Sequence, residues 1–234
     1  MKGLFMTLLA CAIAAPAMAG STQASKDEAR IERAQEVLTA AVTAPDKGIP
    51  KGLLKEAECV GVFPDLTKGA FIVGGEYGKG VFTCRKPDGT MGPPAFFTIG
   101  GGSVGWQFGG KQADLVLLIM NPGGVKHVLE DHFTLGGEAA AVAGPVGRTA
   151  DAATDAQLHA QILSWSRSHG IFLGASLAGD VIEPDKDATR AFYGKPLTAR
   201  QILVEHEPGV PPGARSFVQL ATRYTHRELS LIHI

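Results

Sequence analysis

Glycine is concentrated in the middle of this chain, between short runs of residues that favour β-strands. The sequence has thirty glycines. Runs rich in Val, Ile and Phe predict strands over residues 60–63, 70–76, 80–85, 95–99, 103–109, 113–120 and 135–143. Turns are expected at Pro64-Asp65, Gly78-Lys79 and Pro87-Asp88-Gly89. Because glycine permits tight bends and close backbone approach, this density indicates a curved antiparallel sheet or a small barrel.

Helical periodicity flanks these strands. Apolar residues recur at helical spacing in residues 26–44, which predicts an N-terminal helix with Ser25 as its N-cap. Further helices are expected over residues 50–58, 123–132, 187–192, 198–204 and 214–224. Residues 157–166 fit both a helix and a strand, and the turn at His169-Gly170 followed by the apolar run 171–177 favours a hairpin. The predicted fold class is therefore α+β, with an N-terminal helix, a mid-chain helix and C-terminal helices.

The first nineteen residues have the parts of a secretory signal peptide. Lys2 precedes an apolar run over residues 4–15, and Ala17-Met18-Ala19 resembles a cleavage site. Lipidation at Cys11 is an alternative, which would make the chain a lipoprotein. We divide the chain into a signal peptide (1–19), an amphipathic helical region (20–47), a main domain (48–225) and a tail (226–234) that fits no pattern. The expected location is the periplasm or another part of the cell envelope.

Two cysteines remain once this segment is removed. Cys59 and Cys84 have no paired CxxC spacing, which argues against zinc. In an oxidising compartment they are candidates for a disulfide if they lie on neighbouring strands, and two buried thiols are the alternative. The histidines are scattered and indicate no metal site, so we expect no metal and no cofactor.

Three enzyme-like motifs overlap between residues 100 and 111. The GxGxxG pattern at 100–105 lacks the helix that a dinucleotide site requires. The GxxxxGK pattern at 105–111 has Gln112 where a phosphate-binding loop needs Ser or Thr. The GxSxG pattern around Ser103 leaves a serine esterase as the alternative function, with His159 or His169 as its base. Because strand-like alternation follows Ser103, we expect no enzyme.

Three blocks of sequence resemble the SYLF family, also called Ysc84-like. They are residues 71–80 (FIVGGEYGKG), residues 101–109 (GGSVGWQFG) and the segment from Asp155 to Leu177 that contains ILSWSRS. The resemblance covers residues 30 to 195 and implies a lipid-binding domain without catalytic activity. Eukaryotic members bind phosphoinositides, and fungal members bind actin. Actin binding is not expected of an exported chain, and the implied partner is phospholipid or a membrane surface.

In some relatives the membrane contact is a basic N-terminal helix, and the matching region here is mixed in charge. Lys26, Arg30 and Arg33 alternate with acidic residues. A second candidate is Lys47, Lys51 and Lys55, which would stack along one helical face beside Leu53 and Leu54. The alternative for this patch is a solvated lysine face over core leucines. A structural envelope protein without a ligand is a separate alternative for the function of the chain. The net charge of −1 gives no general attraction for nucleic acid.

Overall fold

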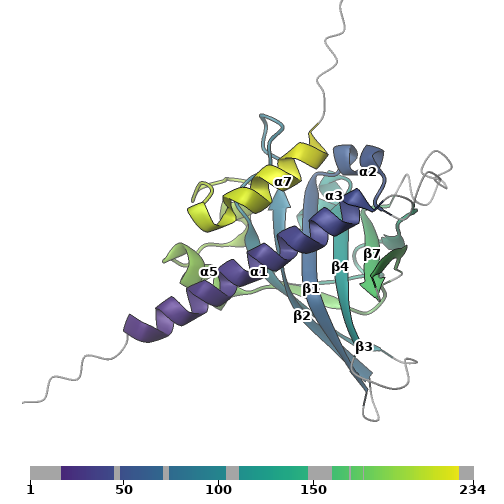
Figure 1. Cartoon of the computed structure of the whole chain (residues 1–234), viewed down its shortest axis with the longest axis horizontal. Helices are drawn as coiled ribbons and strands as arrows, with labels where there is room; N and C mark the ends of the chain where they lie inside the picture. Colours follow the sequence, from purple (N-terminus) through teal and green to yellow (C-terminus); the bar gives the residue numbers. More distant parts are fainter. Residues whose placement is uncertain are drawn as a thin grey trace, which may run out of the picture.

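The computed structural model describes residues 17–44, 48–70, 74–103, 111–146, 160–168, 170–175 and 177–226 (Figure 1). Its strands are β1 (Cys59–Ala70), β2 (Gly74–Cys84), β3 (Ala95–Ser103), β4 (Lys111–Ile119), β5 (Phe133–Thr134), β6 (Ala141–Ala143), β7 (Ile162–Ser168), β8 (Ile171–Gly174) and β9 (Val181–Pro184). Its helices are α1 (Ala17–Thr43), α2 (Lys51–Glu56), α3 (Pro122–Val128), α5 (Lys186–Tyr193), α6 (Ala199–Leu203), the short 3-10 helix η2 (Pro212–Ala214) and α7 (Arg215–Thr225).

All the described strands belong to one curled sheet. The order is β5-β9-β3-β2-β1-β4-β7-β6, and β8 pairs with β7. Every pairing is antiparallel except that of β6 with β7. Helix α1 lies across β1, β2 and β4, and α7 runs beside it (Figure 1). The expected α+β class, with its curved sheet and its N-terminal and C-terminal helices, is confirmed.

The central strands are longer than the sequence predicts. Pro64-Asp65, expected as a turn, is a bulge within β1, where the register shifts against both β2 and β4. Asp65 takes the left-handed conformation there, with a φ of 52°, which Asp tolerates better than most residues. Its N–H donates to Asp114 Oδ1 at 3.1 Å. Gly78-Lys79, also expected as a turn, lies inside β2. Pairing on both sides therefore overrides the local turn preference.

Glycine makes room for aromatic rings between β1 and β2. A Cβ added to Gly61 would lie 2.3 Å from Phe82 Cε1, and one added to Gly80 would lie 2.5 Å from Phe63 Cδ1. The rings of Phe63 and Phe82 pack edge to face with their centres 5.7 Å apart. Part of the glycine density therefore serves close packing as well as curvature.

Both faces of the sheet are buried. One face, with Val62, Val116 and Trp165, packs beneath α1 and α7. The opposite face, with Phe97 and Leu117, packs against residues of α3, α6 and β5. Strands covered on both sides have no polar face, which explains the continuous apolar run in β4.

Local sequence signals place most helix ends correctly. Asp185 caps α5 by accepting from Ala188 N–H at 3.0 Å, and Gly194 ends it with a φ of 71°. Thr198 and Gln201 form a capping box at α6. The prediction of Ser25 as an N-cap is wrong, because α1 runs through this position.

The region after α3 departs from the predicted strand over residues 135–143. Only Ala141–Ala143 is a strand, because Gly136, with a φ of 75°, turns the chain at the start of the segment. The hairpin favoured for the following region is present as β7 and β8.

Candidate functional site

Helix α1 buries its apolar stripe. Ile31, Leu38 and Val42 are at most 6% exposed and lie in the core. The exposed face of α1 carries both signs of charge, with Lys26 and Arg33 among Glu28, Glu32 and Glu36. In this conformation α1 therefore offers neither an apolar face nor a cationic face to a lipid surface.

Arg30 belongs to a buried ion cluster and cannot contact lipid in this conformation. Its guanidinium lies 3.0 Å from Asp27 Oδ1 and 3.2 Å from Asp185 Oδ2. It also covers the ring of Phe96, 5.2 Å from the ring centre. Lys79 Nζ approaches Asp185 from β2 at 3.3 Å. The prediction of Arg30 as a lipid contact therefore needs correction, since its side chain joins α1 to α5.

The two acids of this cluster have opposite pKa shifts. Burial raises the pKa of Asp27, and Arg30 and Gln23 do not fully offset it. Burial would also raise the pKa of Asp185, but the N–H of Ala188 together with Arg30 and Lys79 outweighs it and lowers the pKa. The cluster therefore depends on the cation at Arg30.

The other two basic residues of α1 remain on the surface. Lys26 is exposed. Arg33 Nε lies 2.6 Å from Asp65 Oδ2 in an exposed pair that ties α1 to the bulge of β1. The charge of Arg33 is therefore already matched within the protein.

Helix α2 presents its lysines outward and its leucines inward. Lys51 and Lys55 are exposed. Leu54 is fully buried and Leu53 packs partly against the core. Leu54 is thus a core residue, and its prediction as a lipid contact is also corrected. Lys47 lies outside the described residues.

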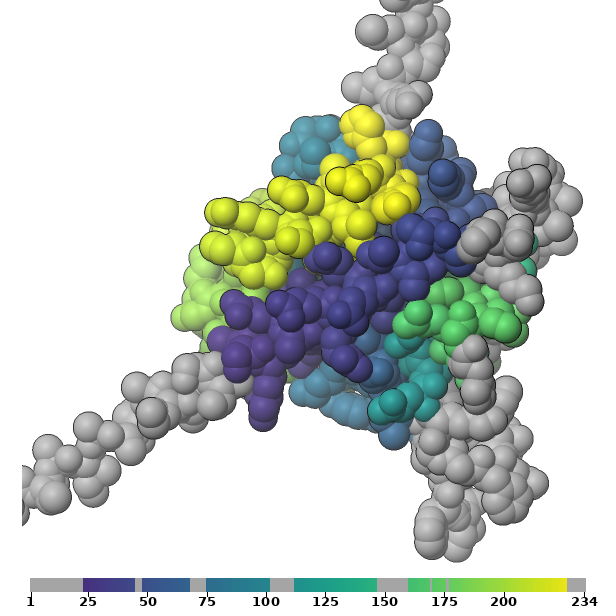
Figure 2. Space-filling view, in the orientation of Figure 1, coloured from purple at the N-terminus to yellow at the C-terminus, as the bar shows by residue number. Residues whose placement is uncertain are grey.

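Helix α7 extends the positive charge beside α2. Figure 1 shows the two helices near each other at one end of the molecule, and Figure 2 shows α7 on the surface next to α1. Arg85 links their ends by donating to Thr225 O at 2.8 Å and to Lys55 O at 2.9 Å. Helix α7 exposes Arg215 and Arg223, and the sequence has no acidic residue from 215 to 226.

We call Lys51, Lys55, Arg215 and Arg223 the cationic surface. A groove of about 490 Å³ runs along α7 beside it, with Met91, Val210 and Val218 among its lining residues. Lys86 also lines this groove, but its Nζ pairs with Asp88 Oδ2 at 2.8 Å. The helical periodicity of residues 214–224 predicts α7 but indicates no role for it. Its acid-free composition was a usable signal, whereas its position beside α2 depends on tertiary packing.

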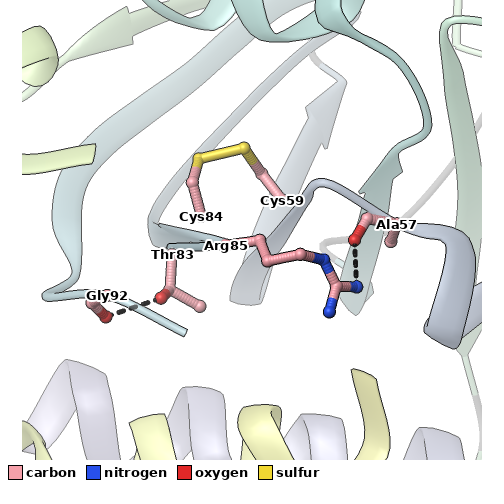
Figure 3. The surroundings of a disulfide bond; sticks show 6 residues. All are labelled: Ala57, Cys59, Thr83, Cys84, Arg85 and Gly92. Atoms are coloured by element: carbon pink, nitrogen blue, oxygen red, sulfur yellow. Dashed lines mark hydrogen bonds between the residues drawn. A yellow bond between two sulfur atoms is a disulfide. The ribbon is translucent and has the colours of Figure 1, made fainter. Parts of the chain in front are cut away.

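Cys59 and Cys84 form a disulfide next to this region (Figure 3). They face each other directly across β1 and β2, with their Cα atoms 4.0 Å apart. Arg85 follows at once and donates to Ala57 O at 2.6 Å. The disulfide therefore fixes the strand ends from which Arg85 holds α2 and α7.

The described residues around the enzyme-like motifs do not have the local structure that those motifs require. Ser103 is the last residue of β3 and pairs with Gly74, whereas a nucleophile elbow needs a sharp turn. Lys111 opens β4, although a phosphate-binding loop would place it at the start of a helix. Residues 104–110, His159 and His169 lie outside the described residues. The described part of the chain contains no group of three or more potential metal ligands.

No helix within those residues is both long enough and apolar enough to cross a bilayer.

Comparison with known proteins identifies related chains. A family model described as "Ysc84: Las17-binding protein actin regulator" matches residues 100–224. The "LAS seventeen-binding protein 3" of Saccharomyces cerevisiae is 34% identical over 189 residues, covering 78% of this chain and 41% of the relative. "Protein YSC84" of the same yeast is 32% identical, covering 80% and 41%. The human "SH3 domain-containing YSC84-like protein 1" is 28% identical, covering 78% and 53%. The chain thus spans between two fifths and about half of the relatives that it matches.

Proposed function

Because this chain belongs to the Ysc84 family, we propose that it binds anionic lipid at a membrane surface and catalyses no reaction. The observation that carries this proposal is the cationic surface, on which two neighbouring helices expose four basic side chains. The signal-like N-terminus leads us to include export to the cell envelope in the proposal. The names of the relatives refer to Las17 binding and actin regulation, and we do not extend those partners to an exported chain.

The size of the expected attraction can be worked out from the charges. A basic residue near an anionic membrane contributes about 1 kcal/mol. Four of them would therefore contribute up to about 4 kcal/mol, or roughly a thousandfold in affinity at low salt. Because this attraction is electrostatic, it should weaken as salt is added.

Vesicle flotation tests the proposal. The chain without residues 1–19 should float with vesicles of phosphatidylcholine and phosphatidylglycerol, and much less with phosphatidylcholine alone. Each of two double variants, Lys51→Glu/Lys55→Glu and Arg215→Glu/Arg223→Glu, should weaken binding at least tenfold.

The matched control is Lys126→Glu/Lys195→Glu, which makes the same change in net charge at exposed positions outside the cationic surface. This variant should bind within about twofold of the unmodified chain. Failure of the unmodified chain to float with anionic vesicles would refute the proposal. If the control lost as much vesicle binding as the two double variants, binding would depend on the net charge of the protein and not on the cationic surface.

The absence of catalysis has its own test. Ester hydrolysis by the purified chain should be no faster than in buffer, and Ser103→Ala should change nothing. Turnover that disappears in Ser103→Ala would establish the esterase alternative instead.

A further inference from the structure

A second concave site lies between α5, α6 and the turn that follows α3. Its volume is about 650 Å³, within the range of about 300–1,000 Å³ that is typical of small-molecule sites. The floor is apolar and includes Leu129, Leu197 and Ile202, which pack together in the core cluster on the face of the sheet opposite α1. This cleft shares no lining residue with the cationic surface.

The carboxylates that line the cleft have partners within the protein. Asp131 Oδ1 lies 3.2 Å from Lys186 Nζ, and Glu130 Oε2 lies 3.4 Å from His127 Nδ1. Both acids and Lys186 are therefore engaged in local pairs at the rim.

Arg190 and Arg200 also line the cleft, and both are exposed. Within the described residues, no carboxylate lies within ion-pair distance of either guanidinium. One comes from α5 and the other from α6, so two separate elements supply positive charge to one apolar cavity. A guanidinium presents a planar set of donors that matches carboxylate and phosphate oxygens.

We propose that this cleft binds a single-chain anionic amphiphile, with its carboxylate or phosphate group at Arg190 and Arg200 and its alkyl chain over Leu129, Leu197 and Ile202. The charge of the rim selects an anionic head group, and the apolar floor selects an alkyl tail. Each methylene buried on the floor should raise the affinity roughly fourfold. The binding needs no membrane, so the site does not depend on the cationic surface.

Isothermal titration calorimetry with decyl phosphate, below its micelle concentration, tests the site. The unmodified chain should bind decyl phosphate at least tenfold more tightly than either inorganic phosphate or the uncharged decyl maltoside. Arg190→Gln/Arg200→Gln should weaken binding of decyl phosphate at least tenfold. Both substitutions are at exposed positions, and an unchanged melting temperature would show that the fold is intact.

Arg215→Gln/Arg223→Gln is the matched control, because it removes two arginines from the cationic surface and should leave decyl phosphate binding within about twofold. In turn, Arg190→Gln/Arg200→Gln should still float with anionic vesicles, so failure here is distinguishable from failure of the proposed function. The cleft proposal is overturned if decyl phosphate does not bind, if inorganic phosphate or decyl maltoside binds equally well, or if Arg190→Gln/Arg200→Gln retains full affinity.

Discussion

Removal of Arg30 tests whether burial or distance determines the strength of an ion pair in this protein. The pair of Arg33 with Asp65 is the shorter one, at 2.6 Å, but its side chains are 57% and 36% exposed. Arg30 and Asp27 are 3.0 Å apart, and their side chains are only 8% and 0% exposed. Distance alone would therefore make Arg33 the more important residue, and burial predicts the reverse.

The expected magnitudes differ severalfold. Arg30→Ala leaves the buried carboxylate of Asp27 without its cation, and breaking a buried pair in this way costs about 3–5 kcal/mol. Arg33→Ala breaks an exposed pair, which costs about 0–1 kcal/mol. The two substitutions change the same residue type on the same helix, so helix propensity cancels in the comparison.

Urea unfolding of both variants at pH 7, followed by circular dichroism, gives the two free energies of unfolding. The difference in free energy of unfolding between the unmodified chain and Arg30→Ala should become smaller as the pH is lowered. The pKa of Asp27 is already raised by burial, and loss of the cation raises it further. The folded variant then binds a proton more tightly than the unfolded chain and gains stability as the pH falls through the folded pKa. Equal losses in Arg30→Ala and Arg33→Ala would refute this reasoning.

Three other predictions concern stability. Cys59→Ala/Cys84→Ala should lower the free energy of unfolding by about 3.5 kcal/mol, because the disulfide closes a loop with a sequence separation of 25; denaturant unfolding measures this, and a loss below about 1 kcal/mol would contradict it. Gly61→Ala should cost about 1–3 kcal/mol through overpacking against the facing ring, whereas Gly52→Ala, with no neighbouring atom within 4 Å, should gain about 0.5–1 kcal/mol in its helix; thermal melting of the pair should shift in opposite directions. Burial lowers the pKa of His206 below its ordinary value of 6.5, so the folded protein binds this proton less tightly than the unfolded chain does. The free energy of unfolding that depends on neutral His206 should therefore be fully present above pH 6.5 and should fall as the pH drops towards the lowered pKa. When the free energy of unfolding is measured from pH 4 to 8, His206→Gln should show less of this decrease than the unmodified chain.

The sequence predicts those features that depend on neighbouring residues. Helical periodicity locates α1, α5, α6 and α7 to within a few residues apart from the earlier start of α1, and the run of β4 is equally clear. The break expected at Pro64-Asp65 does not occur, since pairing of β1 with both β2 and β4 accommodates a bulge there. The local sequence at Pro64-Asp65 does not distinguish a bulge within a strand from a turn that ends it.

In the candidate site, too, some features follow from the local sequence and others depend on tertiary packing. The exposed positions of Lys51 and Lys55 follow from helical spacing, and the burial of Leu54 beside them agrees with the alternative of core leucines. The inward position of Arg30 could not be foreseen, because its partner Asp185 is 155 residues away in the sequence. The cleft at Arg190 and Arg200 likewise arises from the packing of three elements that are separate in the chain.

The distance along the chain between Arg30 and Asp185 also limits the order in which the protein can assemble. Helix α1 is synthesised before α5 and α7, which pack against it and follow all the described strands of the sheet. A nascent chain that stops before residue 185 has no second carboxylate for Arg30 and no α7 to complete the cover of the sheet. Contacts between such distant segments slow folding, because a long loop must close before they form. Helix α1 can therefore complete its packing only after α5 and α7 have been synthesised.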